Sequence, residues 1–124
     1  MQYDATTFTG LAGEALEQYR LVKVSSGELV YADSTDSGVI GVTQKACADA
    51  EIVAVKTILG NGTQLGVAAG TFSVSAALYL ANDGKIDDSG TIIIGYALKA
   101  ATTAGDVVPY VVSPWPELML KTDA

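Results

Sequence analysis

The chain repeats itself, and this internal duplication limits the folds open to it more than any other feature of the sequence. Four short blocks recur in the same order, at an offset of about 55 residues. They pair Ser25–Gly27 with Asn82–Gly84, Ile40–Val42 with Ile94–Tyr96, Lys45–Cys47 with Lys99–Ala101, and Glu51–Val53 with Asp106–Val108. A unit of this size cannot bury a hydrophobic face alone, so the two copies are expected to pack together.

The duplication divides the chain of 124 residues into three parts. A single β domain is expected over residues 11–112, built from similar halves at about 12–58 and 69–112. An N-terminal arm of residues 1–10 precedes it, and a C-terminal tail of residues 113–124 follows it. A chain of this length suits one hydrophobic core, and hydrophobic residues make up 49% of it.

Short β-branched and aromatic runs between glycine and aspartate turns predict an all-β fold, a small barrel or sandwich of about 8–10 strands. One short helix is expected over Leu11–Tyr19, where Leu11, Ala15 and Tyr19 share a face. The expected strands are Arg20–Val24, Glu28–Ala32, Val39–Thr43, Ile52–Leu59, Leu65–Ala69, Phe72–Val74, Leu78–Leu80, Ile92–Lys99 and Val107–Val112.

Two of these strands carry a glycine in their middle, Gly41 and Gly95. Glycine inside a strand usually marks a bulge or a close approach of another backbone, so a kink shared by both halves is predicted. The run Ile92–Ile94 is apolar on both faces of its strand and predicts burial on both sides.

Composition excludes several classes of function. The net charge is −7 and the basic residues are scattered singly, so no nucleic-acid partner is expected. There is no histidine for a general base or a metal site, and the single Cys47 is interpreted as a small apolar filler. No enzyme activity, metal or cofactor is therefore predicted. No signal peptide or membrane-spanning run is recognisable, which predicts no membrane partner and synthesis in a cytoplasm.

Two glycine-containing loops resemble ligand-binding motifs only in part. Gly60–Gly66 has dinucleotide-loop spacing, but a strand-like run follows it where such a loop opens a helix. Asn82–Asp88 has calcium-loop composition, but Tyr79 and Gly90 fall on essential ligand positions. Gly60–Gly66 is predicted to be a hairpin loop. Asn82–Asp88 is predicted to be a solvated hairpin turn, with a weak cation site as the alternative.

The terminal segments carry the candidate binding residues. Tyr3 and Phe8 lie in the N-terminal arm, and Pro114, Trp115 and Pro116 lie in a proline-stiffened stretch after the last strand. Aromatic anchors dominate protein interfaces, so these residues are candidates for contact with a neighbour. The alternative is that either arm folds back on its own domain.

Four segments in order resemble the capsid cement, or head decoration, proteins of tailed bacteriophages over about residues 12–112. They are Gly13-Glu14-Ala15-Leu16, Ile40-Gly41-Val42, Gly70-Thr71-Phe72-Ser73-Val74 and Ile94-Gly95-Tyr96-Ala97. Two features depart from the family pattern: the first alanine-rich loop lacks a glycine, and Pro109 interrupts the last strand.

The resemblance implies a non-enzymatic structural protein on the outer surface of the virion capsid, made in the host bacterial cytoplasm. It implies binding to the expanded shell, cementing of neighbouring major capsid protein subunits, and a homotrimer at threefold or quasi-threefold sites. The alternative function is a carbohydrate-binding or adhesive β module of a phage tail fibre or baseplate.

Overall fold

The computed structural model describes residues 7–36, 38–58 and 62–112, and nearly all of its regular structure is β. The first sheet contains β1 (Thr7–Leu11), β2 (Leu21–Ser25), β3 (Glu28–Tyr31), β4 (Val39–Thr43) and β5 (Ile52–Thr57). The second contains β6 (Thr63–Val67), β7 (Ala77–Leu80), β8 (Ile86–Asp87), β9 (Ile93–Ala97) and β10 (Val107–Val112). A 3-10 turn, η1 (Asn82–Gly84), joins β7 to β8. The predicted all-β fold class is confirmed.

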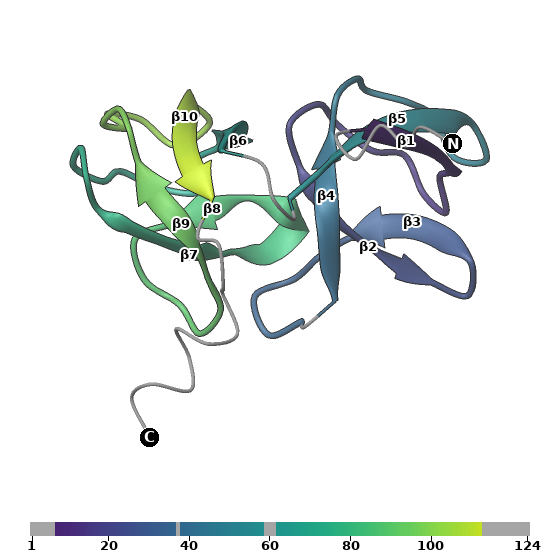
Figure 1. Ribbon diagram of the computed structural model, residues 1–124, viewed down its shortest axis with the longest axis horizontal. Helices are drawn as coiled ribbons and strands as arrows, with labels where there is room; N and C mark the ends of the chain where they lie inside the picture. Colours follow the sequence, from purple (N-terminus) through teal and green to yellow (C-terminus); the bar gives the residue numbers. More distant parts are fainter. Residues whose placement is uncertain (1–6, 37, 59–61, 113–124) are drawn as a thin grey trace.

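The two sheets are built to the same plan. Their strand orders are β1-β5-β4-β2-β3 and β6-β10-β9-β7-β8, so each strand of the first sheet has a counterpart in the second. Figure 1 shows them side by side as two lobes, which we call the first lobe (residues 7–58) and the second lobe (residues 62–112). All the strand pairs of the described residues are antiparallel.

The correspondence extends to irregular details. Leu16 bridges Cys47 in the first lobe, and Phe72 bridges Ala101 at the counterpart position. Tyr19 and its counterpart Ser75 both have positive φ, at 62° and 70°. The expected helix over Leu11–Tyr19 is therefore wrong, because its backbone groups bond across to the 43–51 segment instead of to one another. The expected strand at Phe72–Val74 is likewise wrong, since only Phe72 makes a bridge.

The mid-strand glycines lie where the strands are irregular and close together. The pairing of β2 with β4 shifts register beside Gly41, and that of β7 with β9 shifts beside Gly95. A Cβ atom added to Gly41 would lie 2.6 Å from the carbonyl oxygen of Lys56. One added to Gly95 would overlap the backbone carbonyl of Val111. A side chain at either position would therefore push the neighbouring strand away.

The hydrophobic core has two parts. A smaller cluster fills the first lobe and is formed by Ala12, Leu16, Val22, Leu29, Val53 and Val55. A larger cluster fills the second lobe and extends across the boundary to Leu21, Ala32, Val42 and Ile58 of the first. Leu21 and Val22 are adjacent and both buried, so β2 contributes one side chain to each cluster. The first sheet is thus covered on two sides, and the lobes share a core.

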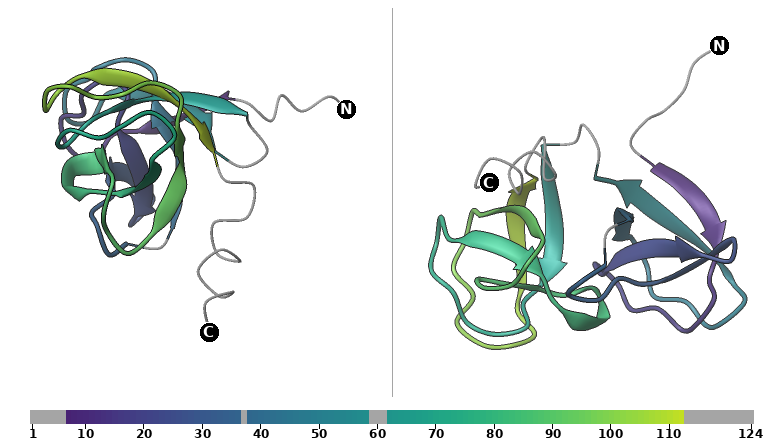
Figure 2. Two further views of the ribbon diagram at one scale, coloured as in Figure 1. Left: turned by 90° about the vertical axis from the view of Figure 1, so that its left-hand side faces the viewer. Right: turned by 90° about the horizontal axis from the view of Figure 1, so that it is seen from below.

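The turn η1 fastens the second lobe to the first. The N–H of Gly84 donates to the carbonyl of Ala32 at 2.8 Å, and the N–H of Asp83 donates to Asp33 Oδ1 at 3.0 Å. The guanidinium of Arg20 donates to the carbonyl of Asp83 at 3.0 Å. The prediction of a solvated hairpin turn at Asn82–Asp88 is wrong for η1, because its backbone groups bind the other lobe. The right-hand view of Figure 2 shows the two lobes next to each other.

Candidate functional site

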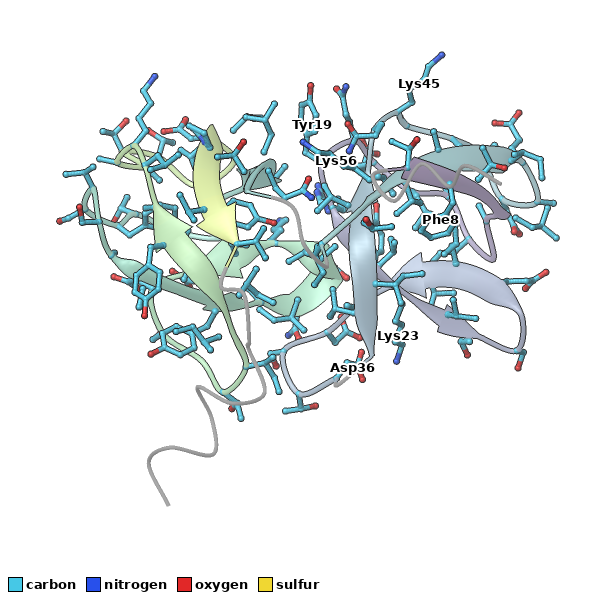
Figure 3. The ribbon with its side chains drawn as sticks, in the orientation of Figure 1. Phe8, Tyr19, Lys23, Asp36, Lys45 and Lys56 are labelled. Atoms are coloured by element: carbon cyan, nitrogen blue, oxygen red, sulfur yellow. The ribbon has the colours of Figure 1, made fainter. Side chains whose placement is uncertain are left out.

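The terminal residues predicted to bind a neighbour divide into two groups. Tyr3, Pro114, Trp115 and Pro116 lie outside the described residues. Phe8 lies in β1 opposite Val55, half-buried against the cluster of the first lobe (Figure 3). The N-terminal arm predicted for residues 1–10 is therefore wrong for Thr7–Gly10, because these residues pair with β5. Phe8 is a packing residue of the sheet.

The polar and titratable side chains of the described residues are dispersed over the two lobes. No three of their His, Cys, Asp or Glu side chains are grouped as a metal site would need. Cys47 is half-buried beside the cluster of the first lobe. Burial raises the pKa of the Tyr110 hydroxyl, which lies in the apolar core with no hydrogen-bond partner. No helix of the described ranges is long and apolar enough to span a membrane.

Two carboxylates have lowered pKa values, and both stabilise loops. Hydrogen bonds from the backbone amides of Thr102 and Thr103 lower the pKa of Asp106. Glu51 accepts from the amide of Ala48 in the corresponding loop of the first lobe. The pKa of Asp36 is lowered by the backbone amide of Asp33 and by Lys23, whose Nζ is 2.9 Å away. The arrangement of these carboxylates is architectural.

A small cleft opens where the two lobes meet. It has a volume of about 120 Å³ and is lined by Tyr19, Gln44, Lys56, Thr63, Gln64, Leu65 and Pro109. Lys56 Nζ donates to the carbonyl of Thr63 at 3.0 Å, and Gln64 Nε2 donates to the carbonyl of Thr57 at 2.9 Å. Figure 3 shows Tyr19 and Lys56 close together at this boundary. Ligand pockets usually enclose about 300–1,000 Å³, so this cleft is too small for a drug-sized ligand.

One face of the second sheet is exposed and apolar. Tyr96 lies opposite Val111, and Leu65 lies opposite Pro109, whose carbonyl accepts from Leu98. Five of the nine exposed large hydrophobic side chains among the described residues lie on this face, which we call the apolar face: Leu65, Tyr96, Leu98, Val107 and Val111. Leu65 and Pro109 also line the cleft, so the two features are continuous. Contiguous exposed apolar surface of this kind usually marks a protein-binding site.

The prediction from sequence did not include the apolar face. Its residues alternate with buried ones along β10, and this alternation is the pattern of any strand with one face in the core. The apolar face could have been found by comparing the two repeats. Leu65, Leu98 and Val111 occupy the positions where the first lobe has Thr9, Gln44 and Lys56.

Comparisons with known proteins give a consistent result. A model of the phage cement protein family matches residues 3–112. No curated protein sequence matches the chain. Among solved structures, the N base of head fiber protein gp8.5 from bacteriophage phi29 superposes with a TM-score of 0.73 at 23% identity. The superposition covers 87% of this chain and 93% of that one, and it shows a common fold.

Proposed function

The chain belongs to the phage cement protein family, and from this premise we propose that it is a non-enzymatic structural protein of the virion. It binds the outer surface of the expanded capsid and cements neighbouring major capsid protein subunits, as a homotrimer at threefold or quasi-threefold sites. The observation that carries the proposal is the match of the family model to residues 3–112, nearly the whole chain. The fold shared with a base domain of a phage head fiber supports it.

The physical requirements of a cement protein agree with this structure. A protein that binds only the assembled, expanded shell stabilises that state by mass action, and many copies add their effects. A cement protein needs a stiff body with a protein-binding surface, and it needs no catalytic centre. The lobes form a stiff body because they share one core cluster, and the apolar face is a surface suited to protein contact.

A glycan-binding function receives no comparable support. Sugar rings stack on exposed aromatic side chains, and Tyr96 is the only exposed aromatic residue among residues 7–36, 38–58 and 62–112. The cleft at the lobe boundary is small, and Tyr96 is not among its lining residues.

Co-sedimentation tests the proposal. Purified protein is mixed with expanded phage heads that lack their decoration and, in parallel, with unexpanded heads of the same phage. Saturable binding to the expanded heads alone is expected, together with a higher temperature of head disruption. Equal binding to both forms, or binding to neither, contradicts the proposal.

A further inference from the structure

One face of the first sheet is covered by the second lobe. Leu21, Val42 and Lys56 form one row across β2, β4 and β5. The second lobe covers this row: Leu21 and Val42 are each 1% exposed, and Lys56 bonds to Thr63. This face of the first sheet is therefore covered by the second lobe.

The counterpart row in the second lobe is open. Ala77, Tyr96 and Val111 form it across β7, β9 and β10, with the same register. Tyr96 is 39% exposed and Val111 is 37% exposed, although their counterparts Val42 and Lys56 lie against the other lobe. Two sheets built to one plan thus differ in whether a lobe lies on them.

The side chains around the open row are more apolar than their counterparts in the first lobe. Polar residues of the first lobe are replaced by apolar ones at four counterpart positions of the second. The pairs are Thr9 and Leu65, Gln18 and Val74, Gln44 and Leu98, and Lys56 and Val111. Gln18 bonds to the carbonyl of Gln44, whereas the counterparts Val74 and Leu98 are 56% and 48% exposed. Leaving such apolar area in water is unfavourable, at roughly 25 cal/mol per Å².

The chain also carries an unused covering element. In the lobe junction the covering turn is η1, seated against Leu21, Ala32 and Asp33. Its counterpart is Ser25–Gly27 of the first lobe, which is exposed, and a Cβ added to Gly27 meets nothing within 4 Å. One chain therefore presents an open face at one end and a free covering turn at the other. These are complementary parts of a head-to-tail contact, which forms a ring when its rotation closes.

We propose that the apolar face is covered by the first lobe of a second copy of this chain, which repeats between chains the junction seen within one chain. The inference rests on the proposed trimeric assembly and names its interface. The polar partners are not repeated, since Ala76 is the counterpart of Arg20. The contact between copies therefore depends on the apolar area around Tyr96 and Val111.

A charge-insertion pair tests the proposal in solution and on the capsid. Y96K/V111K places two lysines on the cross-strand pair of the apolar face. L11K/I52K is the matched control, because Leu11 and Ile52 form an exposed cross-strand pair at the far end of the first sheet. Sedimentation equilibrium of the full chain is expected to show a trimer for wild type and control and a monomer for Y96K/V111K. Circular dichroism confirms that each variant is folded.

Cross-linking between chains tests the contact even if copies of the protein associate only on the capsid. S26C and S89C, each in a C47A background, are mixed and treated with a short bismaleimide, free and on decorated heads. Ser89 is the counterpart of Ala32, which accepts from η1 in the lobe junction. The expected product is an S26C–S89C dimer, with none from the control mixture of D49C and S89C.

The outcomes separate this inference from the proposed function. A monomeric Y96K/V111K that still binds expanded heads weakly leaves the cement function standing and supports the interface. An unchanged trimer, or no S26C–S89C product in solution or on heads, overturns the interface. A structure of decorated heads with the apolar face against major capsid protein overturns it as well.

Discussion

The N–H of Gly84 donates a 2.8 Å hydrogen bond to the carbonyl of Ala32, and this bond joins the turn of the second lobe to the sheet of the first. Gly84 has φ of +71°, and a Cβ there would lie 2.8 Å from the backbone nitrogen of Leu21. The contact allows no side chain, so the attachment of the lobes depends on a glycine at this point.

Replacing Gly84 by alanine is expected to separate the lobes and to lower the free energy of unfolding by about 3 kcal/mol or more. Gly27 is the matched control, because it occupies the counterpart turn with φ of +81° but has nothing within 4 Å of an added Cβ. Gly27→Ala should cost about 1 kcal/mol, from its backbone conformation alone. Urea denaturation measures both, and equal losses would show that the contact with Leu21 is unimportant.

Tyr110→Phe is expected to leave stability unchanged or to raise it by up to about 1 kcal/mol, because the Tyr110 hydroxyl is buried without a partner. Tyr31→Phe should instead lower it by about 1 kcal/mol, since the Tyr31 hydroxyl accepts from the N–H of Glu17. Chemical denaturation of the two variants compares them directly. A larger loss for Tyr110→Phe would mean that its hydroxyl has a stabilising partner.

Burial raises the pKa of Tyr110 above its ordinary value of 10.0, which predicts a pH dependence as well. The unfolded chain ionises first, so wild type should lose stability as the pH rises above about 10. Tyr110→Phe has no phenol to ionise at this position, so its stability should exceed that of wild type by a growing amount over the same pH range. A constant difference between the two proteins across that range would contradict the buried, neutral phenol.

Asp106→Asn tests the alanine-rich loop of the second lobe. The folded pKa of Asp106 is below its ordinary 3.8, so its stabilisation is present above that value and is lost as the pH falls through the lower folded value. The variant should be less stable than wild type at about pH 7, with a gap that closes in acid. Asp49→Asn, in an exposed loop, is the control for the change in net charge. A gap that does not vary with pH would assign the effect to packing instead of charge.

Two truncations separate the terminal segment from the strand that follows it. Removal of residues 1–6 leaves β1 complete and should not change the midpoint of thermal unfolding. Removal of residues 1–10 deletes most of β1, uncovers Leu29 beneath Gly10, and should lower the midpoint by several degrees, on the order of 5 °C. Capsid binding of the shorter truncation then reports on Tyr3 alone among the predicted aromatic anchors. An unchanged midpoint after both deletions would show that β1 contributes no stability.

The sequence was informative where local chemistry determines structure. Strands over Val39–Thr43 and Val107–Val112 follow from β-branched runs and agree with the structure residue for residue. The strand Thr7–Leu11 was missed because its alternating threonines and glycine have no dense apolar run, and its partner β5 is distant in sequence. Local propensity cannot represent such a long-range pairing.

The candidate site was harder to predict, because its signal is a comparison between the lobes. Tyr96 by itself is an ordinary strand residue. Its exposure is informative only by comparison with Val42, which is buried at the counterpart position. Asn82–Gly84 looked like a surface turn because sequence gives no indication that another lobe receives its amides. The lack of histidine and the scattered basic residues can be seen in the sequence itself.

Electron cryomicroscopy of expanded heads, imaged with and without the purified protein, is the sharpest test of a cementing role. Added density is expected on the outer surface, at threefold or quasi-threefold positions, and the two-lobed body should fit it with contacts to more than one major capsid protein subunit. Heads that show no added density at saturating protein, or density that contacts a single capsid subunit and bridges none, would contradict a cementing role.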